Sequence, residues 1–348
     1  MQTQYAGGVL AIERMQSRVP WNITNLLITN YSVPKACFSQ PPTTAQLVRE
    51  LNTLELSIFG ILTFLTVLSL IIFIENAVYL SKKIRCSFKQ KTLIWSSSVP
   101  TVISVLSCFG LWFPSSMMFV DMGINAYFSI NFYLILMIMI QGFGGKEALV
   151  KTLENKALVI STGPCCCCCP CLPRMKMTMQ KLNLFILGVC QLVFLKPVFT
   201  IIAIILWSNG SYDVEDISLT SSCVWIGTFL GVSMIIALWP LGILFRQAKV
   251  HLAEQNMGTK FALFQILLIL TTLQNSIFSI LASNGQIACS GLYSSKARAQ
   301  LMHNHLLIVE TFLLATVVRT KYRKRDEKAG YGRLPVIAVD DNTAVIKV

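Results

Sequence analysis

LELSIFGILTFLTVLSLIIFIENAVYL, residues 54–80, is an apolar stretch longer than the ~20 residues that a membrane-spanning helix requires. Its two charged residues, Glu55 and Glu75, lie near its ends. The stretch therefore predicts a transmembrane helix. Similar apolar segments recur along the chain, so we expect an all-α, polytopic membrane protein built as a seven-transmembrane-helix bundle. The other expected spans are residues 92–113, 115–141, 182–207, 222–245, 260–283 and 299–318.

Composition agrees with this class. Hydrophobic residues make up 54% of the 348-residue chain and charged residues 13%, and the mean hydropathy is +0.62. Soluble domains carry about 25% charged residues. The net charge is +13, but the charges lie between the apolar segments, which favours membrane topology over binding of nucleic acid.

The orientation follows from the basic residues. The segments outside the spans form two alternating sets. The set that begins with the N-terminal segment contains 6 Lys and Arg residues in total, and the other set contains 22. Because basic loops stay in the cytoplasm, we expect residues 1–53 to be extracellular and the basic tail, 319–348, to be cytoplasmic. Three N-x-S/T sequons, which fall in segments expected outside, are predicted glycosylation sites: Asn22, Asn30 and Asn209.

The expected cytoplasmic loop 142–181 contains the run GPCCCCCPCLP, residues 163–173. Stable disulfides are rare in the cytoplasm, and zinc sites use spaced ligands that converge on one ion. Metal binding, redox sensing and simple packing stay open as alternatives, but we predict palmitoylation, which would anchor the loop to the inner leaflet. The predicted lipidation sites are Cys165, Cys166, Cys167, Cys168, Cys169 and Cys171.

Lys196 lies inside the fourth expected span, next to Pro197. A lysine left in lipid at mid-membrane costs about 2.5–3.5 kcal/mol, so it should face a partner or a polar region. Glu310 in the seventh span is the natural opposite charge. The two residues are therefore candidates for solute contacts, with a structural ion pair or a snorkelling lysine as alternatives.

The sixth expected span has a polar stripe. At about 100° per residue, its polar side chains fall within roughly a third of the helix circumference. Such a stripe either hydrogen-bonds neighbouring helices or lines the route of a polar or amphipathic solute. The stripe comprises Gln265, Thr272, Asn275, Ser276, Ser279 and Ser283, of which we predict Gln265, Thr272, Asn275 and Ser279 as substrate-binding residues.

Two features concern packing of the fourth and fifth spans. Pro197 and Pro240 lie within these spans, and prolines there can kink a membrane helix without forbidding it. Gly227 and Gly231 form a G-x-x-x-G, which permits close helix contact inside the chain or with a partner chain.

Motifs of other functions are missing. The chain has no G-x-x-x-x-G-K-[ST], H-E-x-x-H or G-x-S-x-G motif, so we expect neither an enzyme nor a cofactor or metal site. A seven-span signalling receptor is the main alternative. The third span ends in QGFGG and the seventh in LLATVVRTKY, however, and neither carries the motifs typical of such receptors. A membrane enzyme acting on lipids is a third alternative.

Several motifs resemble the organic solute transporter alpha family. The polycysteine block and the EQNMGTKFALFQ segment are the most specific, and the likeness extends over residues 30–332. The matching stretches are ACFSQPPT (36–43), FGLWFP (109–114), GFGGKE (142–147), TGPCCCCCPC (162–171), EQNMGTKFALFQ (254–265) and NGQIACS (284–290).

The resemblance implies a seven-span subunit that works with an obligate single-span beta subunit. The pair is expected to move bile acids, conjugated steroids and related amphipathic anions across the basolateral plasma membrane, in either direction. The resemblance implies no coupling to ATP or sodium, and residence in the endoplasmic reticulum when the subunit is unpaired.

Overall fold

The computed structural model describes residues 44–84, 87–154, 176–209, 221–252, 257–289 and 293–323. Within these ranges the regular elements are helices, as predicted. In chain order they are α3 (Thr44–Glu50), α4 (Thr53–Lys83), α5 (Ser87–Ser97), α6 (Val99–Trp112), the 3-10 helix η2 (Pro114–Ser116), α7 (Met117–Gly142), α8 (Lys146–Leu153), α9 (Met179–Ser208), α10 (Ser222–His251), α11 (Met257–Ser283) and α12 (Ser295–Arg323).

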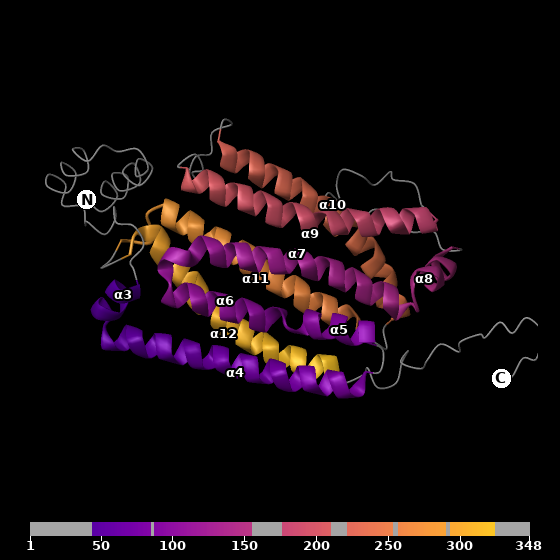
Figure 1. Cartoon of the computed structure of the whole chain (residues 1–348), viewed down its shortest axis with the longest axis horizontal. Coiled ribbons are helices and arrows are strands. Elements are labelled where there is room, and N and C mark those ends of the chain that lie inside the picture. Colours follow the sequence, from indigo (N-terminus) through magenta and orange to yellow (C-terminus); the bar gives the residue numbers. More distant parts are fainter. Residues whose placement is uncertain are drawn as a thin grey trace, which may run out of the picture.

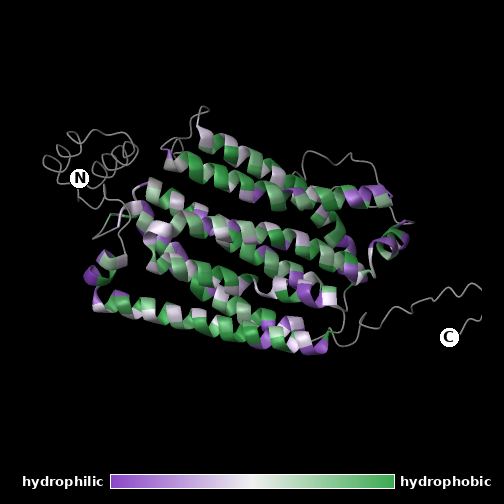
Figure 2. Ribbon diagram, viewed as in Figure 1, coloured by the Kyte–Doolittle hydropathy of each residue, from purple (hydrophilic) through white to green (hydrophobic). Residues whose placement is uncertain are grey.

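The long helices confirm a polytopic membrane bundle. Six of the described helices are long and apolar enough to cross a membrane, and the pair α5 and α6 makes a seventh if it counts as one span. Hydrophilic residues gather mainly at the helix ends, and apolar residues make up most of the length of the long helices (Figure 2). α9 and α10 continue through Pro197 and Pro240, so both prolines are tolerated inside spans.

The second expected span, 92–113, is not one straight helix. α5 and α6 meet at Ser98 with a bend of 42°. Pro100 explains the break, because it has no backbone N–H and leaves the carbonyl of Ser96 without its helical donor. Hydropathy does not register one lost hydrogen bond, so it indicates this apolar segment but not the bend within it.

The helices run roughly along the long axis of the molecule (Figure 1). α12 packs against α4, α6 and α11, and α7 packs against α6, α9 and α10, so these two helices form the centre. Aromatic contacts hold α7 to α11: Phe132 lies edge-on to Phe264, with 5.0 Å between ring centroids. α4 lies at one edge of the bundle, and the α9–α10 pair lies at the other (Figure 1).

Hydroxyl side chains join α4 to α6. The Ser69 and Thr101 hydroxyls lie 3.2 Å apart, and the Ser104 hydroxyl donates to that of Thr66 over 3.2 Å. All four residues are buried. Small hydroxyl residues let membrane helices approach closely, so this contact holds the edge helix to the centre.

Two glycines mark the end of α7. Gly144 and Gly145 follow the helix with φ of 95° and 111°, a conformation that favours glycine. The chain turns there into the short helix α8.

Candidate functional site

Lys196 lies on the inward face of α9. Val189 and Ala203, seven residues before and after it, are both buried, with 0% and 6% of their surfaces exposed. Positions seven apart share a helix face, so the Lys196 side chain lies on the face that packs into the bundle. Within the described part of the chain, its ammonium group has neither a hydrogen-bond nor an ion-pair partner.

Glu310 does not pair with Lys196, contrary to the charge complementarity expected from the sequence. It lies on α12 and accepts a hydrogen bond from Gln274 Nε2 of α11 over 3.2 Å. α9 and α12 do not form a substantial contact, so the two charges belong to different parts of the bundle. The sequence signal that could have indicated this contact is periodicity. Gln274 is a polar residue outside the polar stripe, on the face of α11 that meets α12.

The polar stripe of α11 lies largely on the outside of the bundle. Thr272, Ser276 and Ser279 are exposed, and Gln265 and Asn275 are half-buried. The Thr272 and Ser276 hydroxyls donate to carbonyl oxygens of their own helix, over 2.6 and 2.9 Å. These two hydroxyls therefore keep lone pairs available as acceptors for a group arriving from the bilayer side.

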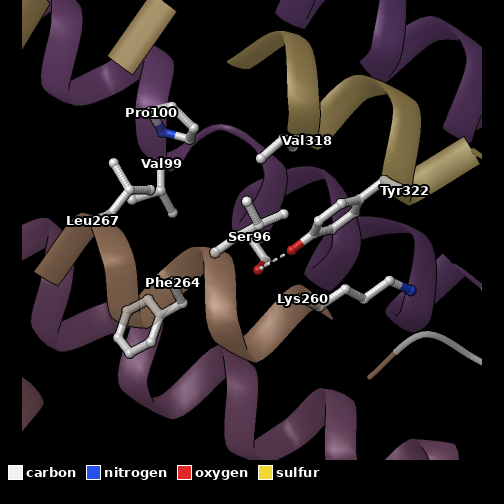
Figure 3. Close-up of a pocket in the computed structure, with 9 residues that line it drawn as sticks. Ser96, Val99, Pro100, Lys260, Phe264, Leu267, Val318 and Tyr322 are labelled. Carbon is white, nitrogen blue, oxygen red and sulfur yellow. Dashed lines mark hydrogen bonds between the residues drawn. The ribbon is translucent and has the colours of Figure 1, made fainter. Parts of the chain in front are cut away.

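A second polar cluster lies where α5, α11 and α12 meet, and the sequence did not indicate it. The Ser96 and Tyr322 hydroxyls are 3.0 Å apart, and the Lys260 ammonium lies 5.2 Å from the centroid of the Tyr322 ring. These residues line a cavity of about 10 Å³, about the size that one water occupies. Figure 3 shows the Lys260 side chain passing beneath the ring, with its nitrogen pointing away from Ser96. The cluster joins the bend of the second span to the ends of two other helices.

The predicted modification sites are only partly within the described residues. Asn209 follows the last residue of α9 and is exposed, so its amide is accessible. Asn22 and Asn30 lie outside the described residues, as do Cys165–Cys169 and Cys171.

Comparison with known proteins identifies the family. The family model described as "Organic solute transporter Ostalpha" matches residues 58–327. The chain is 54% identical over 318 residues to the human protein named "Organic solute transporter subunit alpha", covering 91% of this chain and 94% of the relative. The protein of that name from Bos taurus is 52% identical with the same coverage, and that from Leucoraja erinaceus is 48% identical over 88% of this chain and 87% of its own length. No solved structure matches. The chain belongs to the organic solute transporter alpha family.

Proposed function

We propose that this chain is the multi-span subunit of a heteromeric facilitative transporter of bile acids, conjugated steroids and related amphipathic anions. Membership of a solute transporter family supports the general class. The observation that carries the substrate class is Lys196, an inward-facing cation in an apolar span, with no partner among the described residues. A half-buried cation inside a membrane span attracts an anionic group.

The chemistry of such solutes fits the bundle. A rigid apolar body packs on the apolar helix faces, and a sulfonate, sulfate or carboxylate requires a cation and hydrogen-bond donors. Lys196 supplies the cation, and the polar stripe of α11 supplies amide and hydroxyl groups. We assign binding to Lys196, Gln265, Thr272, Asn275 and Ser279. Glu310 contributes to the polar contacts of the solute through its hydrogen bond with Gln274.

The assembly requires an obligate single-span beta subunit and uses neither ATP nor sodium, so solute moves down its electrochemical gradient in either direction. The transporter resides in the basolateral plasma membrane, and the N-terminus of this chain lies outside the cell. Cys289, in a loop expected outside, is disulfide-bonded, which supports this orientation because stable disulfides form in oxidising compartments. Acylated cysteines of the loop 142–181 anchor it to the inner leaflet.

Uptake of a labelled steroid sulfate tests this function in cells that express the chain with and without the beta subunit. We expect uptake only with both chains, unaffected by removing sodium. Lys196→Ala should lower uptake about tenfold or more at equal surface level, because a charge-assisted hydrogen bond contributes about 1.5–3 kcal/mol. Lys196→Arg, which keeps the charge, is the matched control and should retain most uptake. Normal uptake by Lys196→Ala would remove the proposed role of this residue.

The proposed modifications have separate tests. Hydroxylamine cleaves thioesters, so it should lower the mass of a peptide that contains Cys165–Cys171. Asn209→Gln should lose one glycosidase-sensitive band. An unchanged peptide mass or band pattern would contradict the respective assignment.

A further inference from the structure

The break between α5 and α6 interrupts the backbone hydrogen bonds of a membrane span, and serine hydroxyls replace some of them. Ser97 Oγ donates to the carbonyl of Ile94 over 2.9 Å, and Ser98 Oγ donates to that of Trp95 over 2.7 Å. The helical pattern resumes where the N–H of Val102 donates to the carbonyl of Ser98 over 2.9 Å. These three carbonyls therefore have donors within the chain.

The carbonyl of Ser96 differs from its neighbours. Its helical donor would be the N–H of residue 100, which is a proline and has none. Among the described residues, neither a backbone nor a side-chain group donates to it. Ser96 is only 6% exposed, so bulk water does not reach it freely. An unsatisfied carbonyl inside a membrane protein is costly, which indicates a donor from outside the chain.

A cavity lies in the direction in which this carbonyl points. In an α-helix each carbonyl points along the axis toward the residues three and four positions further on, here Val99 and Pro100. Both residues line the cavity of about 10 Å³ together with Ser96 (Figure 3). This volume is close to the smallest that holds one water molecule.

Two hydroxyl groups border the same cavity. The Ser96 and Tyr322 hydroxyls are 3.0 Å apart, and both residues line the cavity. Each hydroxyl oxygen carries lone pairs that can accept a hydrogen. A buried water requires two to four polar partners, whereas a purely apolar cavity of this kind stays dry. The carbonyl and the two hydroxyls meet that requirement.

We propose that one water molecule is bound in this cavity as a constant part of the second span. It donates one hydrogen to the Ser96 carbonyl and the other to a hydroxyl oxygen of the Ser96–Tyr322 pair. The water thereby takes the place of the N–H group that Pro100 lacks, and it links the end of α5 to α12.

The contacts favour water over a small anion. Lys260 also lines the cavity, but its nitrogen points away from Ser96 (Figure 3). A carbonyl oxygen repels an anion, and the volume suffices for only one water. The occupant must therefore be a neutral hydrogen-bond donor of the smallest size.

Electron cryomicroscopy of the purified alpha–beta pair, at a resolution that shows ordered waters, tests the site directly. We expect a density peak about 2.5–3.0 Å from the Ser96 carbonyl oxygen and at a similar distance from the Ser96 or Tyr322 hydroxyl. A map that shows other buried waters but no peak at this position would overturn the proposal.

Val318→Ile provides an independent test, because it adds one methylene group to the lining of the cavity. Val318 is 4% exposed and lines the cavity from α12. The added group should displace the water and leave the carbonyl unsatisfied, so the melting temperature should fall by about 2 °C or more. Val317→Ile is the matched control, since Val317 is the adjacent residue but is 38% exposed, and it should leave the melting temperature unchanged. An unchanged or higher melting temperature in Val318→Ile would indicate a dry cavity and overturn the proposal.

The Pro100→Ala background separates displacement of the water from simple overpacking. Pro100→Ala restores an N–H group that can donate to the Ser96 carbonyl, so the water is no longer required there. Val318→Ile should then lower the melting temperature much less than it does in the wild-type background. An equal fall in both backgrounds would indicate overpacking and would overturn the proposal.

Discussion

Gln274 of α11 donates a hydrogen bond from Nε2 to Oε1 of Glu310 of α12 over 3.2 Å, across the contact between two membrane spans. The other oxygen of each side chain, Gln274 Oε1 and Glu310 Oε2, is buried with no partner among the described residues. This pair is therefore a polar contact that the surrounding helices only partly satisfy.

Gln274→Leu should destabilise the bundle by about 1–3 kcal/mol, because it leaves the Glu310 carboxyl without its donor. Thermal unfolding of the purified pair in detergent measures the effect. The double variant Gln274→Leu/Glu310→Leu removes both polar groups and should recover much of the lost stability. Equal losses in the single and double variants would contradict this account.

Gly110→Ala should destabilise the contact between α6 and α12. A Cβ atom at Gly110 would lie 3.1 Å from Nδ2 of Asn304 and 3.3 Å from Cγ2 of Val120, so neighbouring side chains must move. We expect a cost of about 1–3 kcal/mol.

Gly60→Ala is the control for Gly110→Ala. Its added methyl group meets nothing within 4 Å, and alanine favours helices over glycine by up to about 1 kcal/mol. Its melting temperature should therefore stay the same or rise. A fall equal to that of Gly110→Ala would show that packing does not decide the difference.

Tyr322→Phe should weaken the contact between α5 and α12 at the bend of the second span. It removes the hydroxyl that lies 3.0 Å from that of Ser96, at a cost of about 0.5–1.5 kcal/mol. Ser96→Ala should cost a similar amount, and the double variant should cost less than the sum of the two. Strictly additive melting shifts would indicate that the two hydroxyls do not interact.

Arg323→Ala should destabilise the chain more than Arg319→Ala. Both guanidinium groups bind Glu75 Oε1, at 3.1 and 2.8 Å, but 20% of the Arg323 side chain is exposed against 40% for Arg319. Arg323 also donates to Asn76 and lies 4.7 Å from the centroid of the Tyr79 ring. An exposed ion pair contributes about 0–1 kcal/mol, so the Arg319 effect should be small and should fade in high salt. The reverse ranking in thermal unfolding would contradict this reasoning.

Much of the fold could be predicted because the hydropathy of a segment depends only on the residues in that segment. Each long apolar run must form a helix in lipid to satisfy its own backbone, so the runs at 54–80 and 182–207 sufficed to place α4 and α9. Hydropathy could not predict the bend at Pro100, since many membrane helices pass through proline intact, as α9 does at Pro197.

The candidate site was predictable only in its parts. Periodicity grouped Thr272, Asn275 and Ser279 on one face, and charge singled out Lys196. Opposite charge also suggested a Lys196–Glu310 pair, which was wrong because charge says nothing about which helices touch.

The sequence by itself thus determined the family, the helical membrane class and the residues with unusual polarity, because each depends on local composition and residue spacing. Only the tertiary structure decided that Glu310 bonds to Gln274, that the polar stripe of α11 faces outward, and that the Ser96 hydroxyl meets that of Tyr322. These facts depend on how the helices pack against one another in space. Residue spacing within a single helix carries no information about that packing.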